Sequence, residues 1–238
     1  MGSPILPYRL GRLCVLPFPG QEVLAFSCSP SRYTIADLYK DLTSDLRPPK
    51  GVPDFASILD EAGEVGISHL VIPYLYGRNR ETLDDYRALA EKMNKAAVEA
   101  KSAGIQLAYH NHAFEFEPKE KGRTGFDVFV EEFVPEMKFE VDVFWVRVGG
   151  KDPVELIRSL KGRVSQLHLK DLEKGTKLPN FGKLPNEAFR ELGNGMIPME
   201  PIIQAASEVG VDHCHVEQDQ STDPIASIGT SMEYLKSL

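Results

Sequence analysis

Two histidines and two glutamates follow an apolar stretch in the run Leu107-Ala108-Tyr109-His110-Asn111-His112-Ala113-Phe114-Glu115-Phe116-Glu117. Alternate residues of a β-strand share one face, so His110 and His112 point one way while Leu107 and Tyr109 point the other. One face would then pack in the core and the other would carry imidazoles. Imidazoles beside carboxylates suit proton transfer and metal binding. The run is therefore the first candidate for a functional site.

Three further apolar stretches carry ionisable or amide side chains on one alternating face. These residues are Asp142 on the first stretch, Gln166, His168 and Lys170 on the second, and His215, Glu217 and Asp219 on the third. Brought together, His110, Asp142, His168 and Glu217 offer two imidazoles and two carboxylates, a ligand set for a divalent metal such as Mn, Co, Zn, Fe, Ni or Mg. Such an ion, chelated by a substrate's carbonyl and adjacent hydroxyl, acidifies the C–H bond between them and stabilises the enediolate.

The elements that must position these residues are short apolar runs alternating with longer amphipathic ones, a pattern typical of βα units around a parallel sheet. The predicted strands are Val23–Cys28, His69–Leu75, Ile105–His110, Lys138–Val143, Val164–Leu169 and His213–Glu217. The predicted helices run from the Asp54 cap to Val65, from Glu81 to Ala103 with a stop at Gly104, Gly125–Phe133, Val154–Leu160 after the Asp152-Pro153 cap, Glu200–Val209 and Pro224–Leu238. Six units in one order, with no glycine-rich phosphate loop after the first strand, favour an α/β fold of the (β/α) TIM-barrel type over a doubly wound sheet.

The predicted barrel is incomplete at its N-terminus. A closed barrel needs eight βα units. Before Val23 only Leu13–Phe18 could form another short strand, and the proline-rich segment Thr43–Pro53 predicts a loop. About six to seven units are thus recognisable within one predicted domain, residues 1–238. Exposed apolar strand edges argue for a partner subunit such as a second copy in a homo-oligomer, for a truncated chain, or for a chain that folds poorly.

The composition and net charge of the chain indicate which classes of molecule it binds. The 238 residues are 42% hydrophobic and 26% charged, which predicts a soluble globular domain. A net charge of -8 disfavours binding to nucleic acid, because the phosphate backbone would be repelled. The sequence shows no secretory signal and no apolar run of about 18 residues, so we expect no membrane-spanning segment. Cys14, Cys28 and Cys214 lack CxxC spacing, which fits a reducing cytoplasm. We expect a cytoplasmic protein that acts on a small polar molecule.

The chain resembles the sugar phosphate isomerase/epimerase family, the xylose-isomerase-like TIM barrels that include inosose dehydratase and the ketose 3-epimerases. The resemblance covers roughly residues 23–238. It rests on the motifs Tyr109-His110-Asn111-His112-Ala113-Phe114-Glu115-Phe116, Glu140-Val141-Asp142-Val143-Phe144-Trp145, Gly149-Gly150-Lys151-Asp152-Pro153, Leu167-His168-Leu169-Lys170-Asp171 and Val216-Glu217-Gln218-Asp219. These motifs are fairly specific for the family and are not specific for one substrate.

The resemblance implies a metal held by a Glu, an Asp, a His and a second Glu from four successive strands. The last three correspond to Asp142, His168 and Glu217, and His110 stands where the first glutamate is expected. That replacement argues against the two-glutamate proton shuttle of the ketose 3-epimerases. The candidate catalytic residues are Glu217, His110, His112 and Lys170, and the candidate substrate-binding residues are Tyr74, Asn111, Glu115, Trp145 and Asp219.

Structural roles are the alternative for several of these side chains. His112, Glu115 and Lys170 suit substrate contact and structural bracing equally well, and Tyr74 and Trp145 suit core packing as well as the wall of a sugar site. Structural roles are also predicted for His69 and His213, because these histidines lie at the starts of strands. Asp171 is predicted to cap a loop, and Asp219 could do the same.

The leading functional prediction is a metal-dependent isomerase or epimerase that abstracts a proton next to the carbonyl of a small sugar or polyol. The same enediolate can expel a β-substituent, so a lyase or dehydratase acting on a keto-sugar, keto-inositol or 3-keto-glycoside is the closest alternative. A non-catalytic truncated barrel that only binds ligand or metal is the third. Endonuclease-like chemistry is the fourth, and the acidic charge disfavours it.

Overall fold

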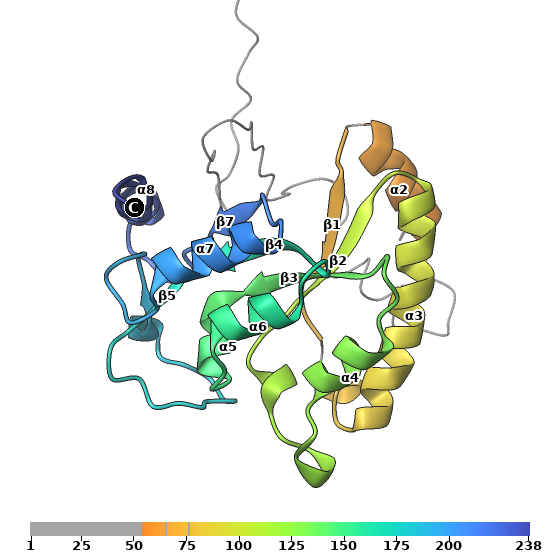
Figure 1. The fold of residues 1–238 in the computed structure, drawn as a ribbon, viewed down its shortest axis with the longest axis horizontal. Coiled ribbons are helices and arrows are strands. Elements are labelled where there is room, and N and C mark those ends of the chain that lie inside the picture. Colours follow the sequence, from red (N-terminus) through yellow and green to blue (C-terminus); the bar gives the residue numbers. More distant parts are fainter. Residues whose placement is uncertain (1–53, 65, 76) are drawn as a thin grey trace, which may run out of the picture.

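The computed structural model of the chain describes residues 54–64, 66–75 and 77–238 (Figure 1). Its strands are β1 (His69–Ile72), β2 (Gln106–His110), β3 (Lys138–Asp142), β4 (Val164–Leu169), β5 (Asp171–Leu172), β6 (Phe189–Arg190) and β7 (Cys214–Val216). Its α-helices are α2 (Phe55–Glu64), α3 (Leu83–Ser102), α4 (Gly125–Glu132), α5 (Val143–Val148), α6 (Pro153–Ser159), α7 (Met199–Glu208) and α8 (Pro224–Lys236). Short 3-10 turns lie at Gly77–Asn79, Phe114–Phe116, Glu120–Gly122 and Asn186–Ala188.

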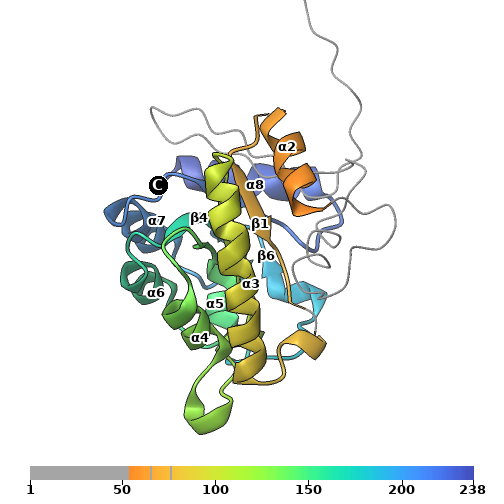
Figure 2. The same cartoon turned by 90° about the vertical axis from the view of Figure 1, so that its right-hand side faces the viewer.

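Five strands form one parallel sheet in the order β1-β2-β3-β4-β7, and β5 pairs with β6 in a separate antiparallel ribbon. The sheet is curled, and α3, α4, α6 and α7 lie along its outer side (Figures 1 and 2). Over the described residues this arrangement is part of an α/β barrel, which confirms the predicted fold class. Each of these five strands was predicted, within one to three residues at its ends. The sixth, Val23–Cys28, lies outside the described residues, as do Leu13–Phe18 and Thr43–Pro53.

The helices begin and end where the local sequence predicts. Thr82 caps α3 in a capping box with Asp85, and Gly104 follows the helix with a φ of +79°, the left-handed conformation that glycine adopts without strain. Asp152 caps α6 by accepting hydrogen bonds from two backbone amides, with Pro153 in the first turn. The sequence did not predict α5 or the β5–β6 ribbon, because elements of six and two residues are too short to show a period.

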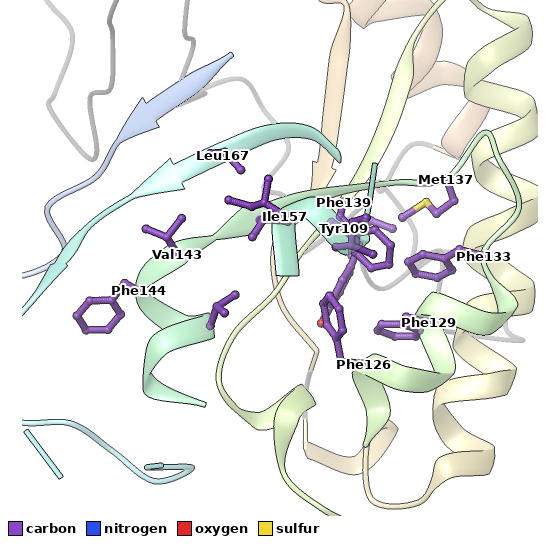
Figure 3. Packing of buried hydrophobic residues seen from close by; sticks show 14 of the residues in the cluster. Tyr109, Phe126, Phe129, Phe133, Met137, Phe139, Val143, Phe144, Ile157 and Leu167 are labelled. Atoms are coloured by element: carbon purple, nitrogen blue, oxygen red, sulfur yellow. The ribbon is translucent and has the colours of Figure 1, made fainter. Parts of the chain in front are cut away.

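The core lies between the sheet and its outer helices. Tyr109 and Phe139 point from β2 and β3 toward α4, where they meet Phe129 and its aromatic neighbours (Figure 3). The ring centroids of Tyr109 and Phe129 are 4.9 Å apart, and those of Phe129 and Phe133 are 4.7 Å apart. The apolar face of each strand is therefore turned outward to the helices, which leaves the other face to the inside of the curl.

A shift in register between β3 and β4 aligns the polar faces of these two strands. Phe139 pairs with Val164, but the next residue, Glu140, pairs with Gln166, so Ser165 is an extra residue on β4. The consequence is that Asp142 lies beside His168. Because side chains alternate along a strand, pairing without the extra residue would have placed Leu167 there instead.

The two edge strands of the sheet approach each other at its amino-terminal end. Among the described residues β1 and β7 each pair on one side only, yet the rings of His69 and His213 lie 5.3 Å apart. The sheet therefore curls far enough to bring residues of distant strands together on its inner face.

Among the described residues, no helix is long and apolar enough to cross a membrane.

Candidate metal centre

The inner face of the sheet carries a buried cluster of imidazoles and carboxylates at the carboxyl ends of β2, β3, β4 and β7. Register places His110 beside Glu140, and Asp142 beside His168 and then His215. Two groups of donor atoms are close enough to share one ion, with the atoms of each group within 4.8 Å of one another. They are His110, Glu140 and His168, and Asp142, His168 and Glu217.

Glu140 lies beneath both imidazoles and orients them. Its Oε2 lies 2.8 Å from His110 Nδ1, and its Oε1 lies 3.4 Å from His168 Nε2 and accepts a 2.7 Å hydrogen bond from Gln166. Burial alone would raise the pKa of Glu140, but His168 and His110 hold it at about 2. An ionised carboxylate that faces one nitrogen of each ring turns the other nitrogen of each ring toward a shared ligand, an arrangement common around metal-binding histidines.

The other two nitrogens face Asp142 and Glu217. His110 Nε2 lies 3.5 Å from Asp142 Oδ2, and His168 Nδ1 lies 3.8 Å from the same oxygen and 3.1 Å from Glu217 Oε2. Asp142 Oδ2 and His168 Nδ1 are both buried, and their partners are charged groups of the same cluster: Lys170 Nζ lies 3.1 Å from Asp142 Oδ2, and Glu217 Oε2 faces His168 Nδ1. Two carboxylate oxygens and two imidazole nitrogens thus converge in one buried place, which suits a cation held between them.

Asp142 is positioned by hydrogen bonds on three sides. Its Oδ1 accepts a 2.9 Å hydrogen bond from the Trp145 amide and so caps α5. Asn111 continues the sheet beyond the end of β2: its side-chain oxygen accepts from the Asp142 amide at 3.1 Å, and its Nδ2 donates to the Asp142 carbonyl at 3.3 Å. One carboxylate oxygen is thus committed to the helix, and the other is presented to the cluster.

Opposing charges set the protonation of the cluster. Burial would lower the pKa of His168, but Glu140 and Glu217 raise it to about 9. Burial would likewise raise the pKa of Glu217, but His168 and Lys170 hold it well below its usual range. Burial lowers the pKa of His215 to about 4, with a further contribution from His168, whose ring lies 5.5 Å away. In this state Glu140 and Glu217 are ionised, and His168 carries a proton where a metal would otherwise bind.

His112 lies at the mouth of the cluster among aromatic rings. It stacks on Phe114 at 5.4 Å with an angle of 6° and meets the edge of Tyr74 at 5.0 Å. Trp145 lies 5.2 Å away on another side. Burial and the nearby His110 lower the pKa of His112 well below 6.5, so the ring is neutral. Tyr74 is 37% exposed, so this aromatic wall reaches the surface.

The structure brings some of the predicted site residues together and separates others. The first group is His110, His112, Asp142, His168, Lys170, Glu217 and Asp219, with Tyr74 and Trp145 at the mouth. Asn111 and Glu115 are fully buried. Asn111 is hydrogen-bonded to the backbone of Asp142, and Glu115 is hydrogen-bonded to Tyr109 and to the His112 amide. These hydrogen bonds brace the backbone around the cluster, and the substrate contact predicted for the two residues stays a prediction. Sequence reasoning did not select Glu140, although it lies two residues before Asp142 and therefore on the same face.

Glu115 fastens the loop that carries His112. Its Oε1 accepts a hydrogen bond from the Tyr109 hydroxyl, and its Oε2 accepts one from the His112 amide at 2.8 Å. Burial raises the pKa of Glu115 to about 7. An acid with a raised folded-state pKa holds its proton longer in the native state, so its contribution to stability falls as pH rises from about 4.5 to about 7.

We expect Glu115→Gln to remove this pH dependence. The free energy of unfolding of the variant should gain on that of the wild type by roughly 3 kcal/mol between pH 4.5 and 8. Urea titrations at each pH measure it. Glu91→Gln is the matched control, because the Lys95 hydrogen bond lowers the pKa of Glu91 and places its effect below this window. Parallel pH profiles for wild type and Glu115→Gln would contradict the assignment.

Residues 32–238 match the family described as xylose isomerase-like TIM barrel. Inosose dehydratase of Clostridium perfringens is 25% identical over 185 residues, which cover 74% of this chain and 60% of that protein. The chain thus spans about 60% of the length of this curated relative.

Two solved structures illustrate the likeness in fold. A sugar phosphate isomerase/epimerase of Parabacteroides distasonis superimposes with a TM-score of 0.64 and 26% identity, covering 89% of this chain and 68% of that one. The IOLI protein with a bound zinc atom superimposes with a TM-score of 0.60 and 15% identity, covering 77% of this chain and 66% of that one. Both agree with a barrel built from βα units.

Proposed function

Because this chain belongs to the xylose isomerase-like TIM barrel family, we propose that it is a metal-dependent enzyme that removes a proton next to the carbonyl of a small sugar or polyol. One observation carries the proposal. Donor atoms of His110, Asp142, His168 and Glu217 converge, buried, at the carboxyl ends of four parallel strands. In barrels of this type, that end of the strands is where active sites lie.

The residues fit a divalent metal. Two imidazole nitrogens and two carboxylate oxygens suit Mn, Co, Zn, Fe, Ni or Mg, and they do not choose among these ions. A metal would explain why two buried carboxylates, Asp142 and Glu217, both face the same nitrogen of His168. When bound, it would supply Lewis-acid stabilisation of the charge that develops on the substrate's carbonyl oxygen. The zinc atom of the IOLI protein, which shares this fold, is in keeping with the proposal.

The protonation states divide the acid and base roles. His112 is neutral and Glu217 is ionised, so either can accept the proton that leaves carbon. Lys170 keeps its proton, because Asp142, Glu217 and Asp219 raise its pKa against the effect of burial. Its role is therefore to donate a hydrogen bond or a proton to a substrate oxygen. Glu140 orients the two imidazoles so that their other nitrogens face Asp142 and Glu217.

The aromatic wall supports a carbohydrate or polyol as the substrate. Tyr74 and Trp145 flank His112, and each of them presents an apolar ring with a polar atom at its rim. Such surfaces pack against the C–H face of a sugar ring while the hydroxyl groups reach the polar cluster. We therefore place the substrate between this wall and the donor atoms.

Two reactions can follow proton removal, and they define two candidate activities. An enediolate that is reprotonated gives an isomer or epimer, and our first proposal is this isomerase or epimerase activity. An enediolate that expels a β-substituent gives a lyase or dehydratase. The second candidate is favoured by the name of the curated relatives, inosose dehydratase.

Exchange of the substrate C–H bond in deuterium oxide tests the proposal. The metal-loaded protein, incubated with keto-sugars, keto-inositols and 3-keto-glycosides, should incorporate deuterium next to the carbonyl of at least one compound. Deuterium in an epimer identifies an isomerase, and loss of water or an aglycone identifies a lyase. Metal binding without exchange in any of these compounds would contradict an enzymatic role and favour a barrel that only binds.

A further inference from the structure

Lys170 places a buried positive charge among the carboxylates of the centre. It follows β4 on the same alternating face as His168, and its side chain is only 4% exposed. Its Nζ lies 3.1 Å from Asp142 Oδ2 and 2.9 Å from Asp219 Oδ2, and it also contacts Glu217 Oε2. Three carboxylates, one from the end of β3 and two from the chain after β7, therefore surround one ammonium group.

Two of those three oxygens are also the oxygens that the metal centre would use. Asp142 Oδ2 and Glu217 Oε2 both face His168 Nδ1 and both contact the ammonium of Lys170. Metal–oxygen bonds of about 2.0–2.2 Å would bring a dication to within about 5 Å of an ammonium that contacts the same oxygen. Two positive charges so close in a buried site repel each other strongly.

We propose that Lys170 is the built-in counter-cation of this centre: its ammonium balances Asp142 and Glu217 when no metal is bound, and a divalent metal displaces it from these two carboxylates and leaves Asp219 as its partner. The inference rests on the proposed metal centre. Asp219 suits the receiving role because it belongs to neither donor group, and its side chain is 13% exposed where Asp142 is fully buried. The Trp145 ring, 5.9 Å from Nζ, offers a second favourable contact at the mouth.

Displacement links metal loading to the substrate side of the centre. In this structure the ammonium is enclosed by its three carboxylates and has little access to solvent. Once Asp142 and Glu217 bind the metal, Asp219 remains its partner and the ammonium turns toward Trp145, in the aromatic wall that we assign to the substrate. A single event then forms the metal centre and delivers the hydrogen-bond donor, which gives Lys170 a positioning role besides its proposed role as an acid.

Removal of the competing charge should tighten metal binding. We expect Lys170→Met, which keeps the apolar stem, to bind Zn²⁺ or Mn²⁺ at least about tenfold more tightly than the wild type in calorimetric titrations. Lys95→Met is the control, because it makes the same charge change on the surface of α3, where Lys95 pairs with Glu91. Equal or weaker binding by Lys170→Met would overturn the inference.

Chemical labelling of the wild type tests the displacement without relying on a variant that could fail to fold. The protein is treated with acetic anhydride with and without Mn²⁺, and the modification of Lys170 is measured by mass spectrometry. We expect labelling to rise several-fold in the presence of metal; unchanged or reduced labelling overturns the inference. If the wild type binds no metal, the proposed function fails as well, whereas metal binding with an unaltered Lys170 response removes this inference alone.

Discussion

Asp142→Asn should abolish stable metal binding and reduce deuterium exchange by about 10³-fold or more. The asparagine side-chain oxygen can still cap α5 by accepting from the Trp145 amide, because asparagine is as good a cap as aspartate. What the variant loses is the anionic Oδ2 that faces both His110 and His168. Replacing residues behind a metal ligand already costs about 10–100-fold in affinity, so losing a ligand should cost more.

Metal content after dialysis and the deuterium exchange rate are the two measurements. Asp152→Asn is the matched control, since this aspartate also caps a helix but lies away from the cluster. His168→Ala should behave like Asp142→Asn, and Glu140→Gln should show the intermediate loss expected of a residue that only orients the imidazoles. Metal retained at full stoichiometry in both Asp142→Asn and His168→Ala would place the centre elsewhere.

The elements of the fold could be predicted because each has a strong local signal. The alternating faces of β2, β3, β4 and β7 and the capped period of α3 are properties of short stretches of sequence. They sufficed to predict a parallel sheet with ionisable residues on its inner face, and to select His110, Asp142, His168 and Glu217 as neighbours. The two strands and the loop predicted within residues 1–53, and the single-domain organisation of the chain, stay predictions.

The arrangement within the cluster could not be predicted, because it depends on register. The extra residue Ser165 decides that Asp142 lies beside His168, and no local pattern reports it. The same register places Glu140 under both imidazoles. A glutamate two residues before Asp142 has the parity of a site residue, but its role emerges only when His110 and Gln166 are known to flank it. Lys170 is the comparable case, since its three partners come from β3 and from the chain after β7.

Asp171 carries the largest expected effect on stability. This carboxylate is 1% exposed and accepts four backbone hydrogen bonds. Oδ1 accepts from Leu172 and Ile197 at 2.8 and 2.9 Å, and Oδ2 accepts from Gly193 and Gly195 at 3.0 and 2.9 Å. It thereby folds residues 193–197 around a single side chain next to Lys170. This is the loop-capping role predicted for Asp171, extended to four amides.

We expect Asp171→Ala to lower the free energy of unfolding by about 4 kcal/mol, because several buried amides lose their acceptor and each costs about 1–3 kcal/mol before the loop relaxes. Urea unfolding measures the change. Asp60→Ala, at an exposed position of α2, should have little effect. Asp171→Asn should not restore stability, since an amide can accept on one side only and would direct its own N–H groups at the other pair of amides.

Gly195→Ala tests the same loop independently. A Cβ at this position would lie 2.3 Å from Asp171 Oδ1 and 2.4 Å from the Leu172 carbonyl oxygen, and neither atom can move without breaking the hydrogen bonds of Asp171. Its destabilisation should therefore not add to that of Asp171→Ala in the double variant, because residues that share one network are coupled. Fully additive losses would mean that Asp171 does not hold the loop. Metal binding by the folded fraction of each variant should persist, since none of the proposed metal ligands is changed.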